Sequence, residues 1–234
     1  MKKMLITGAS RGIGQAIAQT LLQADYQIVG LARFDKDPPL SHANFYAEKL
    51  DLGPSQHLTE NIRAILQRHS PFDGAIFCAG MGKFGGLEQF SHEDMLTQMQ
   101  INFISQAYIT RALLPQLKEK KQGDLIYIGS QAALKGAQKG TIYCASKFAL
   151  RGFTQALREE CAKSHIRISL INPGMVATPF YDTLNFKPGK APENYIEAQD
   201  IADLVNHLLK TRSGTVWEEV NLAPLKKVIE FRTE

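Results

Sequence analysis

A tyrosine and a lysine, Tyr143 and Lys147, stand four positions apart near the middle of the chain. Positions i and i+4 of a helix lie on one face, so the phenol and the ammonium group would be neighbours. A free tyrosine titrates near about 10, and an adjacent positive charge lowers the pKa of a phenol. We therefore expect Tyr143 to be a general acid/base whose pKa is lowered by Lys147. Ser130, at the end of the strand-like run 125–129, would bring a hydroxyl to the same phenol. Taken alone, the pair also fits an ordinary helix surface.

A glycine-rich turn near the N-terminus has the composition of a phosphate-binding loop. The apolar run 3–7 predicts a buried strand, and the spacing of apolar residues over 13–24 predicts a helix. Between them lie Gly8, Gly12 and Gly14, which permit a tight turn and a close approach of the backbone to a diphosphate. The helix N-terminus would add free N–H groups and the positive end of its dipole. An ordinary glycine-rich loop is the competing interpretation.

Several motifs occur in a fixed order along the chain. They are Thr7-Gly8-x-x-x-Gly12-x-Gly14, Asn102, Ser130, Tyr143-x-x-x-Lys147 and Pro173-Gly174-x-Val176-x-Thr178. Each is modest alone, but the ordered set resembles the short-chain dehydrogenase/reductase family in its compact single-domain form. The resemblance extends from Lys3 to about Leu209.

The resemblance implies hydride transfer between a nicotinamide C4 and a small-molecule ketone, aldehyde or alcohol. Tyr143 would protonate the carbonyl oxygen, Ser130 would orient it, and Lys147 would hold the nicotinamide ribose. Asn102 would support a water-linked proton path, although a merely satisfied polar residue is the alternative. The implied catalytic set is Asn102, Ser130, Tyr143 and Lys147. The implied cofactor-binding set is Gly8, Ser10, Arg11, Gly12, Ile13, Gly14, Arg33, Asp51, Leu52, Ala79, Gly80, Asn102, Tyr143, Lys147, Pro173, Gly174, Val176 and Thr178.

Arginines near the second strand favour NADP(H) over NAD(H). NAD-preferring sites usually have a carboxylate after that strand to bind the ribose 2′-OH, but here Ala32 holds the position. Arg33 follows it, and Arg11 lies in the glycine turn, so two guanidinium groups would bind a 2′-phosphate. Asp35 and Asp37 are interpreted as loop residues and not as the ribose acid.

Two further cofactor positions carry open questions. Asp51 closes the third strand, and the resemblance implies contact with the adenine; a turn role before Gly53 can coexist with it. After the fourth strand the family commonly has Asn-Asn-Ala-Gly, whereas this chain has Phe-Cys-Ala-Gly. Ala79 and Gly80 still allow backbone approach, but Cys78 is a weak hydrogen-bonding group, which puts local rigidity in doubt. We expect Cys78 to be a buried thiol and not a nucleophile.

The motifs lie in a chain that alternates strands and helices. Candidate strands are 3–7, 27–32, 45–50, 74–78, 124–129, 166–172 and roughly 216–222. Helical patterns lie at 13–24, 56–69, 92–119, 141–163 and 198–210. This order predicts an α/β fold, a single-domain Rossmann-type doubly wound parallel sheet of about seven strands with helices on both faces, spanning 1–234. The proposed motifs then lie at or just beyond the carboxyl ends of the strands.

Composition favours one cytoplasmic, soluble domain. The chain has 234 residues, 44% of them apolar, and a net charge of +4, and no apolar run approaches the roughly 20 residues of a membrane helix. The start shows no signal-peptide pattern. Three widely spaced cysteines suggest reduced thiols, and six histidines without paired ligand spacing predict no metal. The basic cluster 118–121 fits a helix end better than a nucleic-acid site, so we expect neither nucleic acid nor membrane as a partner.

The substrate is not identified by these patterns. Residues 179–197 form a polar, proline-containing segment that would cover the pocket, and its aromatics would either stack on a flat substrate or pin the loop. The end of the chain weakly resembles sepiapterin-type and broad hydroxy-acid or ketone reductases. In the family, helices such as 92–119 and 141–163 pack across a two-fold axis, which implies a homodimer or homotetramer. A catalytically silent NADP(H)-binding sensor or scaffold is the alternative function.

Overall fold

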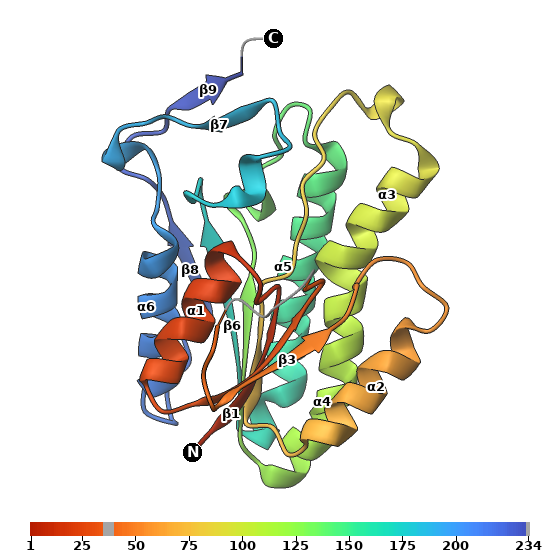
Figure 1. The fold of residues 1–234 in the computed structure, drawn as a ribbon, viewed down its shortest axis with the longest axis vertical. Helices are drawn as coiled ribbons and strands as arrows, with labels where there is room; N and C mark the ends of the chain where they lie inside the picture. Colours follow the sequence, from red (N-terminus) through yellow and green to blue (C-terminus); the bar gives the residue numbers. More distant parts are fainter. Residues whose placement is uncertain (35–39, 233–234) are drawn as a thin grey trace.

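A seven-stranded, all-parallel sheet forms the middle layer of the molecule (Figure 1). This computed structural model describes residues 1–34 and 40–232. The strand order is β3-β2-β1-β4-β5-β6-β8, with the reversal of winding between β1 and β4. The strands are β1 (Lys3–Thr7), β2 (Gln27–Ala32), β3 (Phe45–Lys49), β4 (Gly74–Phe77), β5 (Gly123–Ile128), β6 (Ile166–Pro173) and β8 (Glu219–Leu222). The predicted α/β fold with its doubly wound sheet is therefore confirmed.

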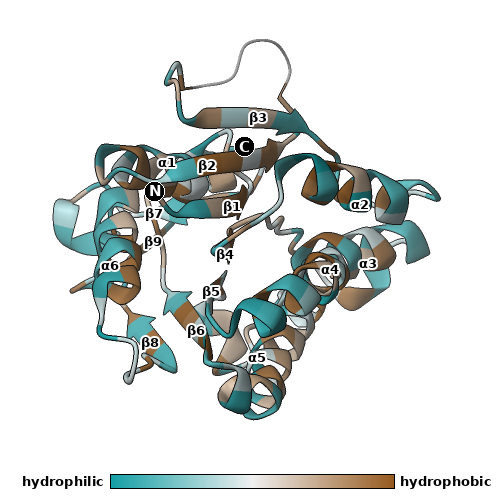
Figure 2. Ribbon diagram, turned by 90° about the horizontal axis from the view of Figure 1, so that it is seen from below, coloured by the Kyte–Doolittle hydropathy of each residue, from teal (hydrophilic) through white to brown (hydrophobic). Residues whose placement is uncertain are grey.

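Helices cover both faces of the sheet (Figure 2). The helices α1 (Gly12–Gln23) and α6 (Ala198–Lys210) lie together on one face. The other face is covered by α2 (Leu58–His69), α4 (Ser105–Lys120) and α5 (Thr141–Cys161). Neighbouring residues of one strand serve opposite cores, because side chains alternate across a sheet: Leu5 packs with α2, α4 and α5, and Ile6 packs with α1 and α6.

The predicted single helix 92–119 is wrong in one respect. It consists of α3 (His92–Met99), a π-helical turn (Gln100–Ile104) and α4. Asn102 lies in the π-helical turn and is fully buried. Such turns insert an extra residue into a helix and are frequent at functional sites. Here the widened turn holds the Asn102 amide against two other segments, which helix periodicity alone does not reveal.

The last strand of the main sheet is shorter than predicted. It begins at Glu219 and not at 216, because its pairing with β6 starts at Leu170 opposite Glu219. The Trp217 ring instead donates a hydrogen bond to Thr211 Oγ1 at 3.0 Å, beside the end of α6.

A second, two-stranded sheet lies beyond the carboxyl ends of the main strands, at the top of Figure 1. It pairs β7 (Phe186–Pro188) antiparallel with β9 (Ile229–Phe231). β7 belongs to the segment 179–197 that was predicted to cover the pocket, and β9 comes from the end of the described chain. No helix among the described residues has the length and apolar character needed to span a membrane.

Candidate active site and cofactor site

A cavity of about 1060 Å³ opens at the carboxyl ends of the strands, beneath the small sheet. This is the position predicted for ligand chemistry in a parallel sheet. Nine of the predicted site residues line it: Ile13, Gly80, Ser130, Tyr143, Lys147, Pro173, Gly174, Val176 and Thr178. The remaining predicted residues do not line this cavity: Gly8, Ser10, Arg11, Gly12, Gly14, Arg33, Asp51, Leu52, Ala79 and Asn102.

Tyr143 lies in the first turns of α5 and is surrounded by aromatic rings. Its ring centroid is 5.0 Å from that of Phe84 and 6.1 Å from that of Phe180. Burial raises the pKa of Tyr143 to about 12, and a side-chain hydrogen bond with Ser130 opposes that rise. The expectation that Lys147 lowers this pKa is wrong for the protein alone, because the removal of water from the phenol outweighs the other influences.

Lys147 lies on the same face of α5 as Tyr143, as the four-residue spacing predicted. It is only 5% exposed, its Nζ donates to the carbonyl oxygen of Ile128 at 3.1 Å, and this nitrogen is 5.9 Å from the Tyr143 ring centroid. Burial lowers the pKa of Lys147 to about 8. The amine therefore sits between the end of β5 and the phenol, in a place that disfavours its charge.

Ser130 caps the short helical turn that follows β5. Its Oγ accepts a hydrogen bond from Ala132 N at 3.1 Å, and its own backbone N–H donates to Asn172 Oδ1 at 3.3 Å. The hydroxyl oxygen is thereby fixed in direction, and its proton remains for another acceptor.

Asn102 joins two segments that are far apart in sequence. Its Oδ1 accepts from Met81 N at 2.8 Å, while its Nδ2 donates to Met81 O at 2.9 Å and to Ser146 Oγ at 3.0 Å. The chain after β4 is thus tied to α5 one residue before Lys147. A Cβ placed at Gly80 would lie 3.5 Å from Asn102 Oδ1 and 3.7 Å from Lys147 Nζ, so these polar groups converge.

The glycine turn has the geometry that a close backbone approach requires. Gly12 has a φ of +57°, and a side chain there would meet Thr178. A Cβ on Gly14 would collide with the carbonyl oxygen of Gly8. Gly8 N donates to Leu31 O at 2.8 Å, which places the turn beside the end of β2, where Arg33 follows.

The two predicted phosphate-binding arginines are available for a ligand. Arg11 is the N-cap residue of α1 and Arg33 follows β2; both are exposed. Neither forms an ion pair within the described part of the chain. Asp35 and Asp37 lie outside the described residues. Asp51 Oδ1 accepts from Gly53 N at 2.8 Å, which is the turn role predicted as its alternative, and Leu52 is buried.

The end of β4 is braced although Cys78 stands where the family resemblance implied an asparagine. Thr7 Oγ1 accepts from Cys78 N at 3.1 Å and from Ala79 N at 3.0 Å, and Gln106 Nε2 donates to Ala79 O at 2.9 Å. The pKa of the Cys78 thiol is raised by desolvation, which agrees with the prediction that it is not a nucleophile, but the prediction of a buried thiol is wrong, because Cys78 is half-buried and lines the cavity. Thr7 and Gln106 were missed as supporting residues, because a strand-end threonine and a helix glutamine carry no distinctive spacing.

The segment after β6 is anchored at both ends. Gly174 N donates to Leu222 O at 2.9 Å, and Thr178 caps the next turn by accepting from Phe180 N at 3.4 Å. Ile196 N donates to Met175 O at 2.8 Å, which closes the base of the covering segment. These hydrogen bonds hold the two ends of the covering segment, residues 179–197. The middle of the segment is held by other contacts.

The C-terminal strand was missed as a part of the site. Lys227, Ile229 and Phe231 line the cavity together with Phe180 and Phe186 of the covering segment. The alternation of apolar and charged residues over 229–231 is a short strand signal, but the sequence does not show with which strand it would pair.

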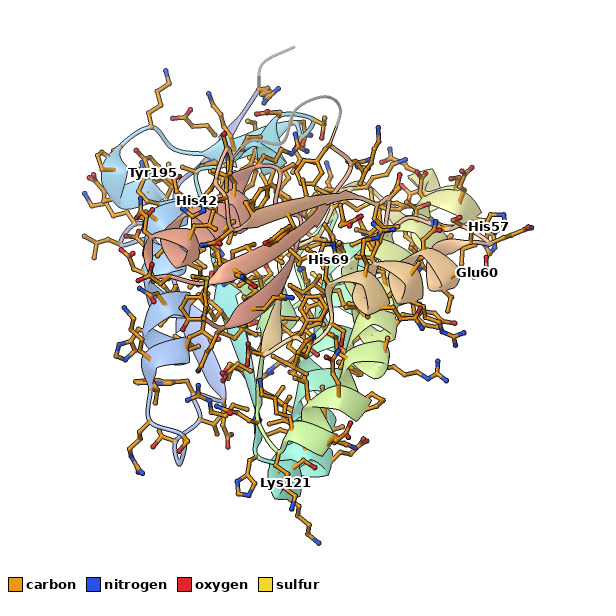
Figure 3. The ribbon with its side chains drawn as sticks, turned by 60° about the horizontal axis from the view of Figure 1, so that its bottom comes forward. His42, His57, Glu60, His69, Lys121 and Tyr195 are labelled. Carbon is orange, nitrogen blue, oxygen red and sulfur yellow. The ribbon has the colours of Figure 1, made fainter. Side chains whose placement is uncertain are left out.

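The described residues contain no group of three or more histidine, cysteine, aspartate or glutamate side chains that could hold a metal ion. His42, His57 and His69 project from separate places on the molecule (Figure 3). Cys78, Cys144 and Cys161 are free thiols.

Comparison with known proteins shows similarity over nearly the whole chain. The model of the short chain dehydrogenase family matches residues 2–188. An uncharacterized oxidoreductase from Staphylococcus epidermidis is 28% identical over 96% of this chain and 97% of its own. A sepiapterin reductase from Chlorobaculum tepidum is 30% identical over 94% of this chain and 95% of its own. The solved structure of an alcohol dehydrogenase from the archaeon Thermococcus sibiricus, complexed with 5-hydroxy-NADP, has a TM-score of 0.83 and 27% identity, covering 97% of this chain and 99% of its own.

Proposed function

The chain belongs to the short-chain dehydrogenase family of oxidoreductases, and on this premise we propose that it is an NADPH-dependent carbonyl reductase or alcohol dehydrogenase. The single observation that carries the proposal is the convergence of Tyr143, Lys147 and Ser130 on one cavity beside the glycine turn. The similar alcohol dehydrogenase carries an NADP derivative, which supports the choice of redox cofactor.

The residues around the cavity fit a phosphorylated dinucleotide. Gly12, with its positive φ, and Gly14, packed against the Gly8 carbonyl, form a tight turn at the N-terminus of α1, where backbone N–H groups would bind a diphosphate. Arg11 and Arg33 are exposed cations without carboxylate partners in the described chain, as a 2′-phosphate site needs. Lys147 and the turn after Pro173 would hold the nicotinamide half, since both line the cavity.

The proposed chemistry divides between cofactor and protein. When bound, NADPH supplies the hydride that reduces a carbonyl carbon. Tyr143 holds its proton at Oη throughout the neutral range, because its pKa is raised, and it delivers that proton to the carbonyl oxygen. Ser130, whose Oγ is already fixed by Ala132 N, orients the same oxygen. Lys147 keeps positive charge near the site at pH 7, below its pKa of about 8.

The proposal is tested by NADPH oxidation with a panel of ketones, aldehydes, diketones, pteridines and 3-oxoacyl thioesters. We expect turnover on members of the panel, and we expect Tyr143→Phe to lower kcat at least about 100-fold, as loss of a general acid does, while NADPH affinity changes little. Tight NADPH binding without turnover on any compound would favour the silent sensor or scaffold. Unchanged turnover in Tyr143→Phe would rule out the proton relay.

We also propose a homodimer or homotetramer and a cytoplasmic location. Tyr108 of α4 and Phe148 of α5 are 39% and 43% exposed, large apolar rings on helices that such an assembly would cover. Three free thiols suit a reducing compartment. Sedimentation of the purified protein distinguishes the monomer, dimer and tetramer.

A further inference from the structure

The strand β9 divides its side chains between the cavity and the solvent. In an antiparallel pair, directly opposed residues share a face, and successive residues alternate. Phe186 is opposite Phe231, and both line the cavity; Lys187 is opposite Glu230, and neither lines it. Lys187 and Glu230 instead approach each other on the outer face, at 3.9 Å. The small sheet therefore presents an apolar face inward and an ion pair outward.

The inner face of β9 is apolar surface that the described part of the chain leaves largely uncovered. Phe231 is 72% exposed and Ile229 is 42% exposed, although both line the cavity. Phe84 and Phe180, which flank Tyr143, line the same cavity, and the Phe84 ring packs edge-on against Phe186 of β7 with the centroids 5.0 Å apart. An apolar group of a ligand that packs against these side chains would remove several aromatic and aliphatic surfaces from water.

Among the described residues, the charged side chains that line the same cavity are all cationic. Lys135, Lys139 and Lys227 line it, in addition to Lys147, and among the lining residues there is no aspartate or glutamate. Lys135 and Lys139 come from the loop after β5, and Lys227 comes from the chain end, so two separate segments supply the cations. None of these three forms an ion pair with a described residue, whereas the adjacent Lys226 pairs with Glu193 at 3.1 Å.

These lysines are distinct from the cations that suit the cofactor. Arg11 and Arg33 do not line the cavity and lie at the glycine turn and the end of β2. Several lysines that line a partly enclosed cavity attract anions and bind them more strongly than the same lysines would on an open surface.

We propose that the site selects carbonyl compounds that combine an apolar body with an anionic group, and that β9 is a specificity-determining wall of that site. The apolar body would lie between Phe231, Ile229 and the rings beside Tyr143, and the anion would face Lys227, Lys135 and Lys139. This inference rests on the proposed function, since it assigns the substrate class of the same site.

Matched pairs of aryl ketones test the inference, each used as a carboxylate and as its methyl ester, with 4-acetylbenzoate and methyl 4-acetylbenzoate as the first pair. We expect the carboxylate to have at least a tenfold higher kcat/KM, with a ratio that falls between 0.05 M and 0.5 M NaCl as the charges are screened. Calorimetric titration of the protein–NADP⁺ complex should show the same order of affinity.

Two neighbouring lysines give the matched variants. Lys227→Gln should reduce the carboxylate preference about threefold to fivefold, while Lys226→Gln, which removes only an outward ion pair, should leave it unchanged. Phe231→Ala should raise KM for both members of a pair by several fold without changing their ratio.

Equal reduction of acid and ester, or equal effects of the two lysine variants, would overturn the inference and leave the proposed reductase intact. A protein that reduces other carbonyl compounds of the panel but neither reduces nor binds any member of the pairs would overturn the inference alone, whereas NADPH binding without turnover on any compound would overturn the proposed function as well.

Discussion

Lys147 links the chemistry of the site to the stability of the fold. The residue is 5% exposed, and burial lowers the pKa of its amine from the usual 10.5 to about 8. Between these two values the unfolded chain binds more protons at this residue than the folded protein does, so its contribution to stability rises with pH. Below about pH 8 the amine is charged in both states, and the folded protein carries the full cost of burying that charge.

We therefore predict that Lys147→Met stabilises the cofactor-free protein at pH 7 while it impairs catalysis. The difference between the two pKa values corresponds to about 3 kcal/mol, and loss of the bond to Ile128 O reduces the expected gain to roughly 1–3 kcal/mol. Urea unfolding at pH 7 and at pH 10 measures the effect, and the gain should shrink at pH 10. An equal gain at both pH values would mean that the buried charge is not its source.

At the cofactor end, Arg11 and Arg33 act as separate cations on separate segments. We predict that Ala at both positions weakens NADPH binding about 100-fold but NADH binding less than about threefold, because only NADPH carries the 2′-phosphate that charge-assisted hydrogen bonds would hold. Fluorescence titration of both cofactors measures this, with the exposed Arg63→Ala as a control. Equal losses for both cofactors would contradict the assignment.

At the scale of elements, the π-helical turn is what brings α3, α4 and α5 to the site together. Its central residue, Asn102, makes three hydrogen bonds to Met81 and Ser146. We predict that Asn102→Ala lowers the free energy of unfolding by about 2–3 kcal/mol, because buried partners are left unsatisfied. Urea unfolding measures the loss, and Gln100→Ala in the same turn should cost less than about 1 kcal/mol. A similar cost for both variants would show that the bracing role is wrong.

The elements differ in how far the sequence determines them. Runs such as 3–7 and 27–32 are apolar on both faces, so only a buried parallel strand accommodates them, and both were predicted with the observed bounds. The pairing of Tyr143 with Lys147 followed from helix geometry. The π-helical turn was not predicted, since the contact made by its central residue, Asn102, is with Met81, 21 positions earlier in the chain, and such a tertiary contact leaves no local pattern.

Electrostatic environment is a further property that local spacing does not reveal. The four-residue interval predicted that the phenol and the amine lie on one face of α5. It did not predict that the rings of Phe84 and Phe180 would surround the phenol. Those rings come from loops after other strands, and their exclusion of water reverses the expected direction of the Tyr143 pKa. Contacts between residues of one helix are thus predictable from the sequence, whereas the exclusion of water from a site depends on the assembled fold.

At the scale of the molecule, the covering segment, residues 179–197, lies over the carboxyl ends of the seven-stranded sheet. Hydrogen bonds hold this segment both at its base and at its middle. Bonds between Met175, Ala177 and Ile196 close the base of the covering segment. Its middle is held by the chain end: Gly189 N donates to Val228 O at 3.1 Å, and Arg232 N donates to Asn185 O at 2.8 Å. The Arg232 guanidinium also donates to the carbonyl oxygens of Asp182 at 2.8 Å and Tyr181 at 3.0 Å.

We predict that Arg232→Ala loosens the cover without weakening the sheet. Amide hydrogen exchange over residues 181–188 should become roughly threefold to tenfold faster, because two side-chain hydrogen bonds to the segment are lost. The midpoint of thermal unfolding should change by less than about 2 °C, since β9 contributes nothing to the seven-stranded sheet. Arg63→Ala on α2 serves as the control, with exchange in the cover unchanged. If exchange at 181–188 stays the same in Arg232→Ala, the bonds at the base of the segment are sufficient to hold it, and the chain end acts only as a wall of the cavity.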